Sequence, residues 1–182
     1  MTRVLPLLAA LVCLTPVAAC AQSTAQPRAV PGPPKTYTAP TGQTAGDIGS
    51  FNSRWTAPAP DIRMQDVLAS ITRGSALLMT GLPTLQVAQA LVNAVARGAS
   101  ASVFIPPSQG KSPLVTDLKR YGVSVYLLAQ EITPTLTVND SAAFVGPLLT
   151  GAGATLKQAP TPQAAAMIQS ALAGLKKWAT PL

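Results

Sequence analysis

The sequence of 182 residues contains no histidine. Imidazole is the side chain that most often acts as a general acid, a general base or a metal ligand near neutral pH, so mechanisms that need it are excluded. The two cysteines, Cys13 and Cys20, both lie in the first 20 residues. The rest of the chain therefore has no disulfide and no cluster of soft metal ligands, and we expect neither a metal nor another cofactor.

Aromatic and charged residues are also scarce, at 4% and 10% of the chain. So few rings argue against a surface on which the bases of single-stranded nucleic acid stack. The formal net charge is +7, but the basic residues are scattered. The adjacent pairs Lys119-Arg120 and Lys176-Lys177 fall near predicted helix ends, where cations offset exposed carbonyl groups. Nucleic acid is therefore a less favoured partner, although the charge does not exclude it.

An apolar run lies at the amino terminus. Residues 1–19 have the three parts of a secretory signal peptide: a positive start at Arg3, an apolar middle over 4–14 and a small-residue end. The middle is too short to cross a bilayer core of about 30 Å as a permanent helix. The end, Val-Ala-Ala followed by Cys20, resembles a bacterial lipobox, in which cleavage before the cysteine leaves it to be acylated.

Lipidation of Cys20 implies secretion across the inner membrane and a lipid anchor in the bacterial cell envelope, with the leaflet left open. Several acyl chains, at about 0.8 kcal/mol per buried methylene, hold a protein on a membrane surface. The alternative is ordinary signal cleavage around Cys20, which releases a soluble protein whose cysteine thiol is neither acylated nor paired. We favour lipidation, because a lone cysteine at the cleavage point has little other use.

The composition then divides the chain into a tether and a domain. Residues 20–60 are rich in Pro, Thr, Ala, Gln, Gly and Ser, which predicts a flexible tether. Phe51 and Trp55 are the exception, and we expect them to dock the end of the tether onto the domain rather than to bind a ligand. The folded domain is predicted over 61–182, with Asp61 as the N-cap of its first helix.

Within the predicted domain, apolar runs of strand length alternate with helical apolar stripes. Such alternation implies parallel pairing with right-handed crossovers. The Asn139-Asp140 turn adds an antiparallel hairpin between strands at 132–138 and 142–145. The sequence therefore predicts an α/β fold: a mixed, mostly parallel β-sheet flanked by helices on both faces.

The hairpin region, Ile132 to Pro147, has the order strand, acidic turn, strand, Gly-Pro. This order resembles the signature segment of the phospholipase D superfamily, which carries H-x-K-x-x-x-x-D on its first strand and a Gly-Ser-x-Asn run after the second. The His, Lys and Asp of that motif correspond here to Thr133, Thr135 and Asp140. The frame is similar to the family, but the reactive groups are missing.

The resemblance extends in family order over residues 61–179, one half-unit of the family fold. Ala90 to Val103 is similar to the segment that ends a helix in Arg-Gly, and Leu118 to Tyr126 to the L-x-x-x-G-V-x-V segment. In the family two half-units share one phosphodiester site across a two-fold axis. The resemblance thus implies a homodimer or pairing with another envelope protein, and a monomer that has lost its pairing face is the alternative.

The resemblance also implies that the chain is not an enzyme. In the family one imidazole attacks phosphorus, another protonates the leaving oxygen, and lysines hold the phosphoryl charge. A hydroxyl at Thr133 has no adjacent base. Asp140 has a simpler explanation as a turn residue, and Thr133, Thr135 and Thr137 as one β-branched strand face. Glu131 is a carboxylate with no second acid nearby in the sequence.

Two functions remain open at this point. The first is a binding or structural lipoprotein that uses an inactive phospholipase D-like domain to hold a partner protein or to form an assembly. The second is a phosphodiester-binding protein, for nucleic acid or phospholipid headgroups, that keeps the cleft without hydrolysis. Phosphate contacts made by lysine and arginine weaken steeply with salt, so salt dependence distinguishes the two.

Overall fold

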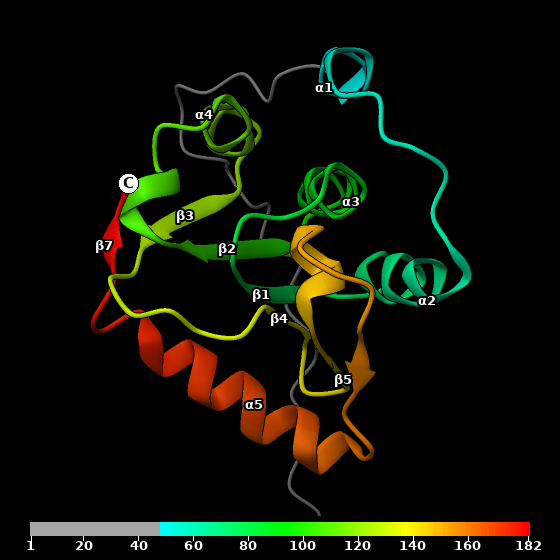
Figure 1. The fold of residues 1–182 in the computed structure, drawn as a ribbon, viewed down its shortest axis with the longest axis vertical. Helices are drawn as coiled ribbons and strands as arrows, with labels where there is room; N and C mark the ends of the chain where they lie inside the picture. The colour runs from blue at the N-terminus through cyan, green and yellow to red at the C-terminus, as the bar shows by residue number, and fades with distance from the viewer. Residues whose placement is uncertain (1–47) are drawn as a thin grey trace, which may run out of the picture. The chain divides into compact units, whose positions relative to one another are not determined.

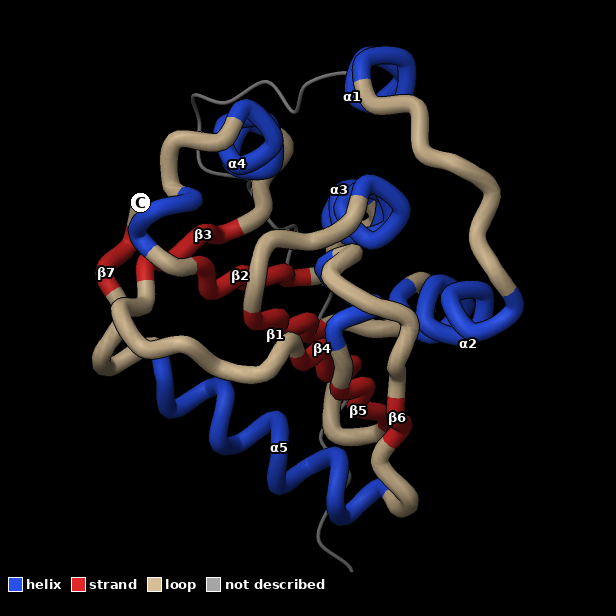
Figure 2. Tube along the Cα trace, in the orientation of Figure 1, coloured by secondary structure: helices blue, strands red, loops and turns tan. Residues whose placement is uncertain are grey.

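The computed structural model describes residues 48–182, so the predicted signal peptide, the lipidation site Cys20 and the tether up to residue 47 lie outside the described residues. The described residues form a seven-stranded sheet with the order β6-β5-β4-β1-β2-β3-β7 (Figure 1; Figure 2). Its strands are β1 (Ala76–Thr80), β2 (Ser100–Ile105), β3 (Ser124–Leu127), β4 (Thr135–Val138), β5 (Ala142–Val145), β6 (Lys157–Gln158) and β7 (Thr180–Pro181).

Helices cover both faces of this sheet. One face carries α1 (Ile48–Arg54), α2 (Ile62–Ile71), α3 (Leu85–Ala96) and α4 (Pro113–Arg120), and the other carries α5 (Pro162–Leu175) (Figure 1). The predicted α/β class, with a mixed sheet between helices, is confirmed. Among residues 48–182 no helix is both long and apolar enough to cross a membrane.

The central strands form the parallel part of the sheet. β1 pairs with β2 and β2 with β3 in parallel, with α3 and α4 as the connections. The Thr84 hydroxyl accepts the Val87 N–H at the start of α3, and Gly98 takes φ +87° just after its end. Because helices cover both faces, β1 and β2 are buried on both sides along most of their length, which explains their continuous apolar runs.

The expectation that the sheet is mostly parallel is wrong: parallel pairing is limited to these three strands, and the other four pairings within residues 48–182 are antiparallel. The sequence predicts the β4–β5 hairpin but neither β6 nor β7, which add antiparallel edges beside β5 and β3. Each of these edge strands is two residues long and exposed. Such short extended segments have no apolar alternation, so the sequence gives no signal for them.

Buried apolar side chains form one cluster on each face of the sheet. The larger cluster joins α2, α3 and α4 to the sheet and includes Met79, Leu91 and Leu136, each at most 1% exposed. The smaller one lies under α5, where Leu172 packs with residues of the sheet and the loop after β3. The last helix therefore presents an apolar stripe to the sheet, but most of the core lies on the other face.

The folded unit begins earlier than the sequence predicts. Residues 48–54, placed in the tether by composition, form α1, and Phe51 is 1% exposed with its ring edge-on to Tyr121. The expected docking of Phe51 and Trp55 is present, but it includes a helix. Seven residues with one buried apolar side chain show no helical periodicity, which is why composition alone assigned them to the tether.

A buried carboxylate fastens this amino-terminal segment to α4. Asp117 is 3% exposed and accepts hydrogen bonds from Arg54 at 3.1 Å and from the Trp55 indole N–H at 2.7 Å. On α3, Gln89 donates to the Trp55 carbonyl and Gln86 to that of Pro58. Residues 48–58 are thus part of the folded unit.

Candidate functional site

The turn of the signature hairpin is fixed by Asn139. Its backbone has φ 47°, a left-handed conformation that asparagine tolerates. Its side-chain oxygen accepts the N–H groups of Ser75 and Ala76 and the Ser75 hydroxyl. The turn is thereby tied to the beginning of β1. Asp140, which follows it, is exposed, so its placement agrees with a turn residue.

Thr133 does not lie on the strand, contrary to the prediction. β4 begins at Thr135, because Pro134 has no N–H to donate to a neighbouring strand. Thr133 is exposed, and its carbonyl accepts hydrogen bonds from the hydroxyls of Thr80 and Thr135, both at 2.9 Å. The expected face of three threonines therefore keeps only Thr135 and Thr137.

Those two threonines are buried beneath α5. Thr135 is 6% exposed and Thr137 0%, and they pair across from Thr80 and Leu78 of β1. The Thr135 N–H donates to the Thr80 hydroxyl at 2.9 Å. Because these groups bond to one another, the hydroxyl at the position of the family's lysine serves the interior of the sheet and does not face a ligand.

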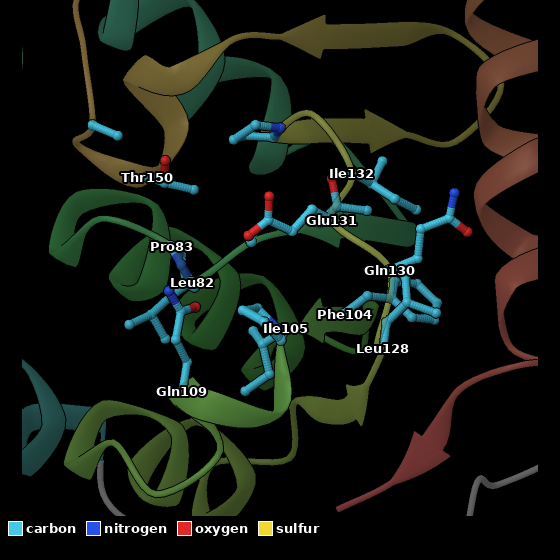
Figure 3. Close-up of a pocket in the computed structure, with 15 residues that line it drawn as sticks. Leu82, Pro83, Phe104, Ile105, Gln109, Leu128, Gln130, Glu131, Ile132 and Thr150 are labelled. Atoms are coloured by element: carbon cyan, nitrogen blue, oxygen red, sulfur yellow. The ribbon is translucent and has the colours of Figure 1, made fainter.

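A cavity of about 350 Å³ opens where the three parallel strands end (Figure 3). Ligands of open α/β sheets bind at this edge, outside the carboxyl ends of the strands. The walls come from the ends of β1, β2 and β3, the 3-10 helix η1 (Pro107–Gln109), the loop before β4 and the segment after β5. The lining residues are Thr80, Gly81, Leu82, Pro83, Phe104, Ile105, Pro106, Gln109, Leu128, Gln130, Glu131, Ile132, Pro134, Thr150 and Ala152.

The lining of this cavity combines apolar walls with polar side chains. Figure 3 shows Glu131 and Gln109 pointing into it from different walls. Glu131 is the one ionisable residue among those that line the cavity in the described part of the chain. The side-chain oxygen of Gln109 is buried and has no hydrogen-bond partner. The cavity therefore offers hydrogen-bond acceptors and a negative charge, with apolar walls around them.

The predicted site residues are only partly brought together. Thr133 lies between two lining residues, Ile132 and Pro134, whereas Asp140 is beyond the far end of β4. The length of β1, roughly 13 Å at 3.3 Å per residue, separates the cavity end from the turn end. Gln109 was not identified from the sequence, although its place in the loop after β2 marks the edge where such sites form.

No group of three or more His, Cys, Asp or Glu side chains within residues 48–182 is arranged to hold a metal ion. Since the cavity wall supplies a single carboxylate, the arrangement suits contacts with hydrogen-bond donors and apolar groups. It has no cationic side chain with which to hold a phosphoryl group.

The solved structures that share this fold include the following two. The first is Nuc of Salmonella typhimurium, described as a phospholipase D family member; it aligns with a TM-score of 0.55 and 12% identity over 69% of this chain and 93% of its own. The fold is phospholipase D-like. The second is TrmBL2, an archaeal chromatin protein described as having a novel mode of DNA binding, with a TM-score of 0.50 and 11% identity over 65% of this chain.

The match spans about half of the TrmBL2 chain, at 51%, so a large part of that protein has no counterpart in it. No protein-family model and no curated protein sequence matches this chain. At identities of 11% and 12% the two likenesses establish the fold.

Proposed function

We propose that this chain is a non-catalytic phospholipase D-like lipoprotein of the bacterial cell envelope, which binds a partner protein through the cavity at the ends of β1, β2 and β3. The proposal includes acylation of Cys20 and an assembly as a homodimer or with another envelope protein. It is supported by the site rather than by the fold alone, because folds of this kind host different activities.

The observation that carries the proposal is the residue type and bonding at the two positions that correspond to the catalytic His and Lys of the family. Thr133 and Thr135 stand where the family has His and Lys, and their polar groups bond to each other and to Thr80. The sequence supplies no imidazole elsewhere, so a second copy of the chain brings none. An unassisted hydroxyl is a weak nucleophile, which leaves binding as the function that the site supports.

The cavity favours a protein partner over a phosphodiester. A phosphodiester carries a negative charge, and the ionisable group that meets it in the described cavity is the Glu131 carboxylate. A peptide instead supplies N–H donors for Gln109 and apolar side chains for walls such as Leu82 and Leu128. TrmBL2, which is described as binding DNA, shares the fold at 11% identity. That likeness is weaker support for a nucleic-acid ligand than the Glu131 carboxylate is against one.

A site-specific crosslink tests the proposal. We would place a thiol-reactive crosslinker on Gln130→Cys, at the cavity, and on Asp140→Cys, at the far end of β4, in intact envelopes. The expected result is a protein adduct from the Gln130 variant alone, which survives nuclease treatment and salt above about 200 mM. An adduct that nuclease removes, or equal adducts at both positions, would contradict a protein partner in the cavity.

A further inference from the structure

The outward side of α5 is unusual for an exposed helix surface. The helix contains no charged residue in its 14 positions. Ala165, Ile168, Leu172 and Leu175 face the sheet, as their burial shows, while Met167 is 74% exposed on the opposite side. A surface helix ordinarily has charged residues on its outer side, whereas the exposed positions of α5 are all uncharged: Pro162, Gln163, Met167, Ser170, Ala171 and Ala173.

Trp178 follows α5 and is 82% exposed, the highest value among the exposed large apolar side chains of residues 48–182. It stands in the turn that directly follows α5, where its N–H donates to the Leu175 carbonyl at 2.9 Å. Lys176 and Lys177, both exposed, precede it directly. Lys176 lies 5.7 Å from the centre of the Tyr126 ring.

Lys176 and Lys177 form no ion pair within the described residues. Residues 141–182 contain three lysines and no Asp or Glu. Within residues 48–182 the one ion pair joins Arg54 to Asp117, on the opposite face of the sheet from α5. The charges of Lys176 and Lys177 are therefore available to an anionic partner.

We propose that the α5 outer surface, defined by Met167, Ala171, Lys176, Lys177 and Trp178, lies on an anionic lipid bilayer. Tryptophan favours the boundary between headgroups and acyl chains, where its ring is in an apolar layer and its N–H reaches polar groups. Lysine stems extend along the same boundary while their ammonium groups meet anionic headgroups, each contributing attraction near the surface. The uncharged helix between them can lie flat at that depth.

A lipid surface fits this region better than a second copy of the chain. A second copy presents no carboxylate on the same surface, so it offers nothing to pair with Lys176 and Lys177. Two large apolar side chains are also far fewer than the 20–30 residues that each partner contributes to a stable interface of about 800 Å². The inference stands independently of what the cavity binds.

The chain length before the domain allows this orientation even for a protein anchored at Cys20. Ile48 is 28 residues after Cys20. At about 3.3 Å per residue, that segment reaches at most roughly 90 Å, which exceeds the dimensions of a domain of this size. The face of the sheet opposite α1 can therefore be turned to the membrane.

Tryptophan fluorescence tests the contact directly, because the chain has two tryptophans. In the full chain with Trp55→Phe, Trp178 is the one reporter, and in the matched chain with Trp178→Phe the reporter is Trp55. On phosphatidylglycerol-containing vesicles we expect a blue shift of Trp178 emission and quenching by brominated acyl chains. We expect neither for Trp55, which bonds to Asp117 on the other face.

The contribution of the lysines is tested with Lys176→Gln/Lys177→Gln in the Trp55→Phe chain. The fraction of Trp178 quenched is expected to fall severalfold, as it also should for the parent in 0.5 M salt or on vesicles without anionic lipid. Unchanged Trp178 emission on vesicles that carry the chain would overturn the proposal. So would a blue shift that needs no vesicles and rises with protein concentration, since that result identifies a second copy as the partner.

Discussion

The two faces of the sheet are built differently. On the face of α2, α3 and α4, one continuous apolar cluster of 24 buried residues joins helices to strands, whereas four buried residues form the cluster under α5. Polar side chains lie under α5 as well, including Thr80, Thr135 and Thr137. Stability is therefore concentrated on the first face, and α5 is held by less apolar area.

Truncation of one leucine on each face gives the largest expected difference. Leu91→Ala in α3 is expected to lower the free energy of unfolding by about 3–4 kcal/mol, because Leu91 is 1% exposed within the larger cluster. Leu172→Ala in α5 is expected to cost nearer 2 kcal/mol, since fewer apolar neighbours surround it. Urea denaturation measures both. Equal losses would show that the two faces carry stability alike.

The amino-terminal helix extends the first face. Substitution of Asp117 tests how much its hydrogen bonds to this segment contribute to the free energy of unfolding. Asp117→Ala is expected to cost about 2 kcal/mol, because the Trp55 indole N–H is left without its buried acceptor. The Arg54 ion pair adds little, since that side chain is 58% exposed. In a Trp55→Phe background the same substitution should cost clearly less. A loss that is identical in both backgrounds would mean that the indole contact does not fasten α1.

The hairpin turn provides a smaller, local test. Asn139→Ala is expected to cost about 1–2 kcal/mol, because three donors at the start of β1 lose their shared acceptor and alanine tolerates φ 47° less well. The neighbouring Asp140→Ala serves as the matched control and should stay within about 0.5 kcal/mol. Thermal unfolding of both variants measures this. If Asp140→Ala lowered the free energy of unfolding by more than about 0.5 kcal/mol, Asp140 would have a structural role beyond the turn.

Much of the central fold could be predicted from local sequence signals. Asp61 caps α2 by accepting the Met64 N–H, as its place before an apolar stripe indicates. Thr161 caps α5 in the same way. Continuous apolar runs identified β1 and β2 because strands that are buried on both faces need no polar alternation.

The features that the sequence did not predict depend on contacts across the fold. Residues 54–58, at and after the end of α1, are held by Asp117, Gln86 and Gln89, which lie far along the chain and carry no local signal. The start of β4 is displaced because Pro134 cannot donate to the ladder, and this removed Thr133 from the strand. The cavity collects residues from several loops, so Gln109 could be assigned to it only after those loops were placed in space.

The central claim is that this phospholipase D-like site binds without cutting. The most direct test is turnover of bis(p-nitrophenyl) phosphate by the full chain, with Thr133→Ala and Glu131→Gln as matched variants. We predict a rate equal to that of the buffer for all three proteins, because the chain contains no imidazole to act as the nucleophile or to activate the Thr133 hydroxyl. Turnover above the buffer rate that disappears in either variant would contradict the claim.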